Sequence, residues 1–117
     1  MTDFYIIDVR QEWRNKPYIT VWRPDDGGYA YPLEWAGKYS KERIDGNPNY
    51  YHKHRWPSQR ALERFPVACA IVDRMGVAPN PREIDGDAGP VIPNTGVNRA
   101  ALRRARYRPA ASENSHV

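Results

Sequence analysis

The sequence predicts an α+β fold, in which a three-stranded antiparallel meander at the N-terminus is covered by short helices. Three observations support this class. Residues 4–31 contain runs of β-branched and aromatic side chains separated by turn residues, as in paired strands. Residues 67–75 carry the clearest amphipathic helical pattern in the chain. A stretch rich in proline and glycine, 77–98, separates them from a basic segment at 99–108.

The meander is predicted from strands at 4–9, 18–23 and 29–31, the first of which extends toward Trp13. Polar turn residues separate the three strands. Pro32 either ends the third strand or confines it to a sheet edge, because proline has no N–H for the ladder. Apolar residues occur on both faces of the second strand, so the alternation does not decide which face is buried.

After the meander, helices are predicted at 41–44, 59–64 and 67–75. Ser40 is a suitable cap for the first of these. Pro66 predicts a break before the third, because its ring would clash with the carbonyl of the preceding turn. The third helix should cover the sheet. Residues 50–56 are aromatic and basic together, and their pattern fits extended chain and helix equally well.

The predicted organisation has four parts. Residues 1–76 form a compact α+β domain, and 77–98 form a long Pro/Gly-rich loop packed on that domain. Residues 99–108 form a basic helix with Asn98 as its cap. Residues 109–117 have the composition of a disordered tail.

The 117 residues suit a single domain with a modest core. The net charge is +4, and the basic residues gather toward the C-terminal end. The single cysteine, Cys69, allows no intramolecular disulfide, which is typical of a reducing compartment. The sequence has neither an apolar run of membrane-spanning length nor the pattern of a signal peptide, so we expect a cytoplasmic protein.

The hairpin and the segment after it carry the side chains that most often dominate binding sites. Tryptophan, tyrosine and arginine are enriched in binding hot spots, and arginine stacks on tryptophan rings. The predicted binding surface consists of Arg14, Trp22, Arg23, Trp35 and Tyr39. We expect Trp22 and Trp35 to be structural, and Arg14 and Arg23 to be the more exposed and more informative positions.

Two basic groups are candidate surfaces for nucleic acid or for an acidic partner. The first is interleaved with aromatic residues and consists of Lys53, Arg55, Arg60 and Arg64. The second lies on the predicted C-terminal helix at i, i+4 and i+7 and consists of Arg99, Arg103 and Arg106. Aromatic stacking beside positive charge suits single-stranded nucleic acid. The same residues also suit a core boundary, a protein interface or a solvated helix face.

Motifs for catalysis or metal binding are weak. His52 and His54 would point the same way on a strand, but no second pair of ligands accompanies them. Cys69 lies among apolar residues, which favours a structural role over a nucleophilic one. No glycine-rich phosphate loop or nucleophile elbow occurs. We therefore expect no enzyme, no cofactor and no metal.

Two segments, VWRPDDGGYAYPLEWAGKY at 21–39 and IDGDAGPVIPNT at 84–95, resemble small proteins encoded by tailed bacteriophages and prophages. The resemblance carries over no activity, cofactor or site residue. It implies a setting only, the cytoplasm of an infected bacterium, where small phage accessory proteins commonly bind a host component.

Three functions follow as hypotheses. The first is a non-enzymatic accessory protein that binds a host protein or protein–nucleic-acid complex, for example as an inhibitor of a host defence complex in the manner of an anti-CRISPR protein. The second is direct binding of nucleic acid or a nucleotide through the basic and aromatic groups. The third is a small enzyme whose substrate the sequence does not name. Aromatic residues on both sheet faces leave a homodimer as a further option.

Overall fold

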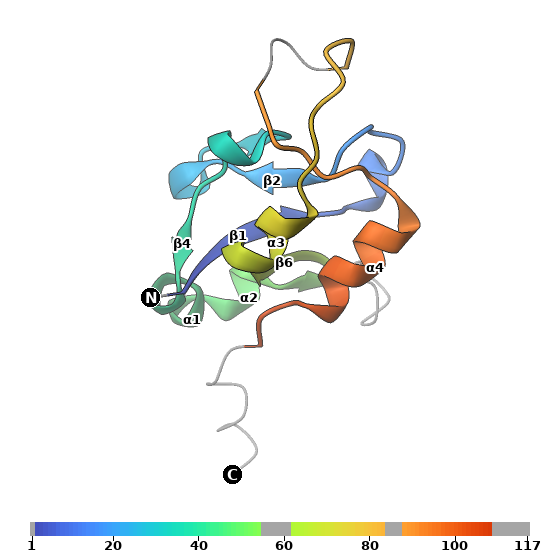
Figure 1. The fold of residues 1–117 in the computed structure, drawn as a ribbon. Coiled ribbons are helices and arrows are strands. Elements are labelled where there is room, and N and C mark those ends of the chain that lie inside the picture. Colours follow the sequence, from blue (N-terminus) through green and yellow to red (C-terminus); the bar gives the residue numbers. More distant parts are fainter. Residues whose placement is uncertain (1, 55–61, 84–87, 109–117) are drawn as a thin grey trace.

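The computed structural model describes residues 2–54, 62–83 and 88–108. The predicted α+β class is confirmed: across these residues an antiparallel sheet of six strands is combined with four α-helices (Figure 1). The strands are β1 (Asp3–Asp8), β2 (Thr20–Trp22), β3 (Tyr29–Ala30), β4 (Tyr39–Ser40), β5 (Lys53–His54) and β6 (Leu62–Ala68). The helices are α1 (Lys41–Gly46), α2 (Pro48–Tyr51), α3 (Cys69–Met75) and α4 (Gly96–Arg104).

Strand β1 lies at the centre of the sheet, whose order is β3-β2-β1-β6-β5. On one side β1 pairs with β4 at its start and with β2 at its end. On the other side it pairs with β6 along its length, from Phe4 opposite Ala68 to Asp8 opposite Arg64. The sheet therefore depends on a pairing between residues about sixty positions apart in the chain.

Strand β6 occupies a region for which helices were predicted, and that prediction is wrong. Leu62, Glu63 and Arg64 lie in β6, while 59–61 fall outside the described residues. The helix predicted from Val67 begins at Cys69 as α3. The physical reason is the long pairing with β1, which buries Phe65 and Val67 completely and outweighs local helix preference.

Pro66 lies inside β6, where a helix break was predicted. Pro66 has no N–H, yet no hydrogen bond with β1 is lost. The backbone N and O of one residue point to the same side of a strand, and at Pro66 that side faces away from β1. The Pro66 carbonyl points away from β1 and accepts a 2.8 Å bond from the Tyr107 backbone N–H. The segment after α4 therefore uses the acceptor that proline keeps.

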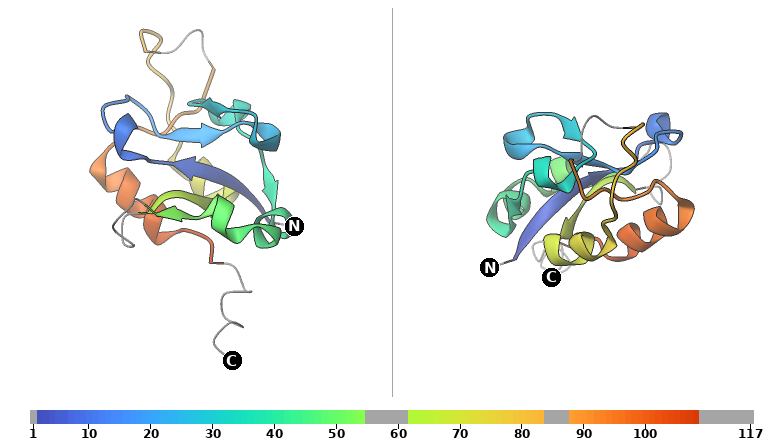
Figure 2. Two further views of the ribbon diagram at one scale, coloured as in Figure 1. Left: turned by 180° about the vertical axis from the view of Figure 1, so that it is seen from behind. Right: turned by 45° about the horizontal axis from the view of Figure 1, so that its top comes forward.

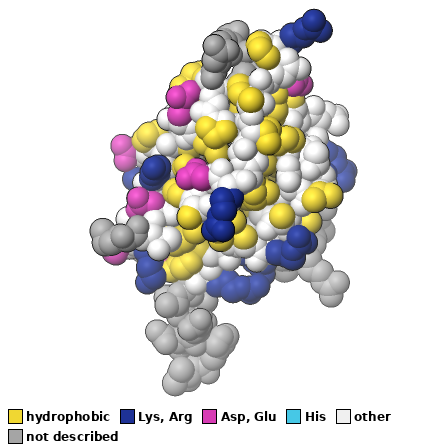
Figure 3. Space-filling view, viewed as in Figure 1, with side chains coloured by type: hydrophobic (Ala, Val, Ile, Leu, Met, Phe, Trp, Pro, Cys, Tyr) yellow, Lys and Arg dark blue, Asp and Glu magenta, His cyan; other side chains and the backbone are white. Residues whose placement is uncertain are grey.

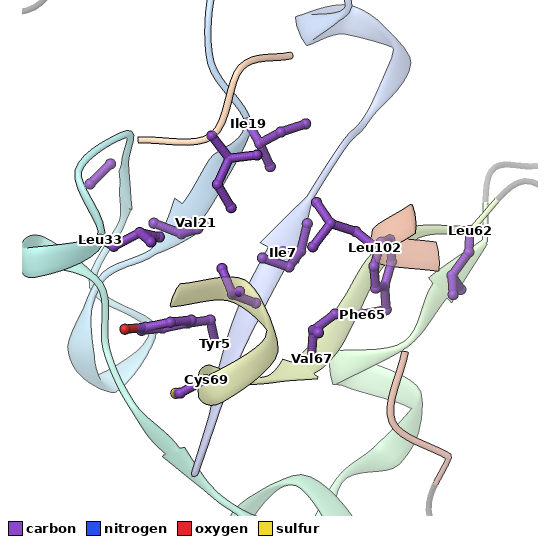
Figure 4. Close-up of a cluster of buried hydrophobic side chains, with 13 residues drawn as sticks. Tyr5, Ile7, Ile19, Val21, Leu33, Leu62, Phe65, Val67, Cys69 and Leu102 are labelled. Carbon is purple, nitrogen blue, oxygen red and sulfur yellow. The ribbon is translucent and has the colours of Figure 1, made fainter. Parts of the chain in front are cut away.

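Both faces of the sheet are buried. On one face α3 and α4 cover a core that includes Ile7, Phe65 and Leu102 (Figures 1 and 4). The other face carries a second core with Ile6, Trp22 and residues of α1 and α2, which lie on this side in the rear view of Figure 2. The fold thus has helices on both sides of one sheet.

Side chains cap two of the helices. Ser40 Oγ accepts a 3.1 Å bond from the Arg43 N–H and begins α1, as predicted. Thr95 Oγ1 accepts a bond of the same length from the Asn98 N–H. Helix α4 therefore begins earlier than predicted, and Asn98 is inside it. No helix in the described segments is long and apolar enough to cross a membrane.

Candidate functional site

Two adjoining hollows lie where β1 ends and β2 begins, and Trp13 and Thr20 contribute to both. The first, named here the arginine pocket, has a volume of about 290 Å³. Its lining consists of Asp8, Val9, Arg10, Gln11, Trp13, Arg14, Tyr18, Ile19, Thr20, Glu63, Asn94, Gly96, Arg99 and Arg103. These residues come from β1, the loop after it, β2, β6 and α4, so only the folded chain assembles them.

Asp8 forms the acidic centre of one wall. It is buried, and its carboxylate accepts bonds from the Arg10 guanidinium at 2.7 and 3.0 Å and from Trp22 Nε1 at 3.2 Å. Arg64 Nε lies 3.8 Å away. The bonds to Asp8 raise the pKa of Arg10 above its ordinary value. Asp8 is therefore paired within the protein and holds Arg10 and Trp22 in place.

Asn94 holds the loop after β1 against α4. Its side-chain amide donates to the carbonyls of Trp13, Arg14 and Lys16 at 3.2, 3.2 and 2.9 Å. Its side-chain oxygen accepts a 2.7 Å bond from Arg99 Nη1. One side-chain amide thus bonds both to the loop that carries Arg14 and to the Arg99 side chain.

Glu63 lies in a β-bulge. Lys53 pairs with Arg64 and His54 pairs with Leu62, so Glu63 has no opposite residue on β5. A bulge redirects side chains relative to the regular alternation of a strand. Leu62 and Phe65 both reach the core under α4, while Glu63 lines the arginine pocket at only 9% exposure.

The second hollow, named here the aromatic groove, has a volume of about 380 Å³. Its lining consists of Trp13, Lys16, Thr20, Arg23, Tyr29, Ala30, Tyr31, Pro32 and Trp35. Tyr29 and Trp35 are 44% and 43% exposed. The Arg23 guanidinium lies 5.2 Å from the centre of the Trp35 ring, within the range of a cation–π contact. The groove thus presents aromatic surface and positive charge to solvent.

The structure separates the five residues predicted on the hairpin. Trp22 and Tyr39 are buried in the core under α1 and α2. Arg23 and Trp35 line the aromatic groove, and exposed Arg14 lines the arginine pocket. The two hollows lie side by side, so these three accessible residues belong to one continuous surface.

The first basic group is only partly described, because Arg55 and Arg60 fall outside the described residues. Lys53 is exposed on β5. Arg64 stacks 4.7 Å from the Trp22 ring centre, and its Nη1 donates to the Tyr50 carbonyl. Arg64 therefore contributes to packing on the face that carries α1 and α2.

The second basic group is divided at the end of α4. Arg99 and Arg103 line the arginine pocket, whereas Arg106 lies beyond the helix and donates to the Arg103 carbonyl. Figure 3 shows Lys and Arg side chains gathered around α4. Arg14 comes from the other half of the chain and joins Arg99 and Arg103 only through the fold.

Sequence reasoning missed Glu63, Asn94 and Tyr29 as site residues. Glu63 was placed in a predicted helix, and Asn94 in a loop without regular structure. The alternation of Glu63, Phe65 and Val67 is the signal that would have indicated a strand with Glu63 on the covered face. Asn94 could not be found in this way, because the carbonyls to which its amide donates are about eighty positions away.

Cys69 begins α3 and lines neither of the two hollows. Across the described segments, no group of three or more His, Cys, Asp or Glu residues is placed to hold a metal ion. Burial raises the pKa of the Cys69 thiol to about 11, with Asp73 adding to the effect, so its thiolate is scarce near neutral pH. Tyr5 donates a 2.7 Å bond to Asp73 beside it. Tyr5 and Cys69 belong to the core under α3, and Asp73 is exposed on that helix.

The fold and the two hollows define a small α+β protein with a basic pocket next to an exposed aromatic groove. Comparisons of the chain with protein-family models, with curated proteins and with solved structures find no match. Its function is therefore argued from the site itself.

Proposed function

We propose that this protein is a non-enzymatic accessory protein that binds another protein through the aromatic groove. The observation that carries the proposal is the exposure of Tyr29 and Trp35 in one hollow beside Arg23. Burying such rings at an interface contributes more than burying most other side chains, and they are enriched in hot spots.

The groove also defines the chemistry of the partner. Lys16 and Arg23 bring two positive charges, and within the described part of the chain no carboxylate belongs to its lining. A hollow of this size accepts a protruding segment better than a flat surface. The proposed partner therefore inserts a segment with apolar and acidic side chains, and the two charges increase the rate of association.

The proposed setting is a bacterial host cell, with a protein of a host defence complex as the partner in its cytoplasm. The support is the resemblance of 21–39 and 84–95 to phage-encoded proteins. These two segments lie together: the Leu33 N–H donates 2.8 Å to the Pro90 carbonyl, and the Gly89 N–H donates 3.0 Å to Glu34. The first supplies most of the aromatic groove, and the second supplies Asn94 to the pocket beside it.

The test is a pull-down of the tagged protein from bacterial lysate, with and without nuclease, using wild type, Trp35→Ala and Tyr50→Ala. Tyr50 is a matched control, because it is 41% exposed and does not line the aromatic groove. We expect a stoichiometric protein partner that survives nuclease, is retained by Tyr50→Ala, and is lost at least tenfold with Trp35→Ala, as for a hot spot of about 2 kcal/mol.

Equal capture by all three proteins would show that the groove is not the binding site. Loss of every partner after nuclease digestion would favour direct binding of nucleic acid instead. That second candidate has its own support, because Arg14, Arg99 and Arg103 meet in one pocket beside the exposed aromatic rings. It predicts an affinity that falls steeply with salt concentration.

A further inference from the structure

The Glu63 carboxylate has no partner in the protein. It is about nine-tenths buried, and no hydrogen bond or ion pair of its side chain occurs within the described part of the chain. Within the described part of the chain, the one fully buried side-chain N or O atom without a hydrogen-bond partner is Arg64 Nε, so the Glu63 carboxylate oxygens remain open to the pocket. Asp8, which lines the same pocket, is fully paired. Glu63 is therefore the acceptor that the pocket offers to a ligand.

The pocket also carries an excess of positive charge. Four arginines and two carboxylates line it, which leaves a net charge of +2. Arg10 is neutralised by Asp8, so Arg14 and Arg99 are the arginines of the lining on which a phosphate is placed here. Arg99 uses Nη1 for both of its bonds to Asn94, and exposed Arg14 lines the same pocket. The first turn of α4, with Gly96 in the lining, adds the positive end of a helix dipole.

The Glu63 carboxylate and the positive charge of the lining together favour a ligand with N–H donors at one end and negative charge at the other. Two acceptor oxygens of one carboxylate are best satisfied by two parallel N–H donors, and a charge of +2 is best balanced by a phosphate monoester. A guanidino compound such as free arginine has the paired donors, but its own positive charge opposes the pocket. A guanine base has the paired donors at its N1 and 2-amino positions and is neutral. The half-buried Trp13 indole offers a surface for the base.

We propose that the arginine pocket binds a guanine nucleoside monophosphate, with the phosphate on Arg14 and Arg99 and the base edge on Glu63. A volume of about 290 Å³ suits a mononucleotide and is small for a dinucleotide. This site is separate from the groove of the proposed function. A ligand in it would contact the Trp13 side chain that both hollows share.

The test is isothermal titration calorimetry of the full chain with GMP, IMP, AMP, inorganic phosphate and free arginine. GMP should bind most tightly. IMP lacks the 2-amino group and should bind about tenfold more weakly, because one bond to the carboxylate is lost. AMP should be weaker still, since its N1 is an acceptor that faces a carboxylate oxygen. Phosphate and arginine should each be weaker than IMP.

Three variants test which residue binds the base of the ligand and which binds its phosphate. Glu63→Gln has nearly the same volume and should reduce GMP affinity at least tenfold while removing the preference for GMP over IMP. Arg14→Ala changes an exposed side chain and should weaken GMP, IMP and AMP by one common factor of about ten. Arg104→Ala is the matched control, an exposed arginine of α4 that does not line the pocket, and should bind GMP like wild type. Near-ultraviolet circular dichroism verifies the fold of each variant.

Four results would overturn the proposal. Phosphate that binds as tightly as GMP would make the pocket a simple anion site. Tighter binding of arginine than of GMP would show that the pocket takes guanidino compounds and that a nucleotide is the wrong class of ligand. Equal weakening by Arg14→Ala and Arg104→Ala would indicate non-specific attraction. No binding of GMP at millimolar concentration would mean that Glu63 serves only to balance the arginines around it.

Discussion

Tyr39 shows how one side chain ties the N-terminal half together. Its hydroxyl donates a 2.6 Å bond to the Arg23 carbonyl and accepts a 2.8 Å bond from the Asp26 N–H. The ring is buried together with Trp22 in the core under α1 and α2. Burial raises the pKa of Tyr39 to about 12. Ionisation would remove the proton that Tyr39 donates to Arg23.

This pKa predicts a loss of stability in alkali. A tyrosine in the unfolded chain loses its proton near pH 10, whereas folded Tyr39 keeps its proton until about pH 12. The contribution is therefore complete below pH 10 and is lost as the pH rises to 12, about 2 to 3 kcal/mol in total. Urea unfolding between pH 8 and 11.5 should show a shallower decline for Tyr39→Phe than for wild type. Parallel declines would contradict the assignment.

At the scale of elements, the turn before β3 is stabilised by side chains of α1 and α2. Asp25 and Asp26 have φ angles of 55° and 58°, a region that costs residues other than glycine about 1 to 2 kcal/mol each. Arg43 of α1 contacts both carboxylates at 3.0 Å, and the Tyr51 hydroxyl donates to Asp26 at 3.1 Å. The turn and helices α1 and α2 therefore stabilise one another.

Removal of Arg43 should loosen this connection. We expect Arg43→Ala to lower the free energy of unfolding by about 1 to 2 kcal/mol, because two charged contacts and the bond to Tyr51 are lost together. Lys41→Ala is the control on the same helix. Its ion pair with Asp45 is solvent-exposed, so its loss should cost less than about 0.5 kcal/mol. Urea unfolding measures both, and equal losses would refute the role of Arg43.

At the scale of the whole molecule, packing between α4, β6 and β1 connects the C-terminal part of the described chain with its N-terminal part. Leu102 of α4 is fully buried in the core with Phe65 of β6 and Ile7 of β1 (Figure 4). The same helix carries Arg99 and Arg103 to the arginine pocket. Packing of α4 therefore decides both the stability of the domain and the formation of the site.

Leu102→Ala should destabilise the whole domain, not α4 alone. We expect a loss of about 2 to 5 kcal/mol, the usual range for a buried leucine. Val97→Ala is the matched control on α4, because Val97 is 77% exposed and its change should stay within about 0.5 kcal/mol. Tryptophan fluorescence and far-ultraviolet circular dichroism should report one coincident transition. Loss of helix signal before the fluorescence change would show that α4 unfolds separately.

The sequence by itself determined the features that depend on neighbouring residues. It indicated the α+β class, the strand character of β1 and β2, and the Ser40 cap of α1, because propensity and capping act within a few positions. It also indicated Arg14 and Arg23 as exposed positions, and both line the hollows, whereas Trp35 was expected to be structural and is 43% exposed.

Only the tertiary structure decided which of these local preferences prevailed. Pairing with β1 made a strand of 62–68, where the ends of two helices and a break at Pro66 were predicted, and this strand carries Glu63 to the pocket. Asn94 became a site residue through bonds to a loop about eighty positions earlier. The physical reason is that strand pairing and pocket lining are contacts between distant parts of the chain, whose free energy exceeds the small differences among local propensities.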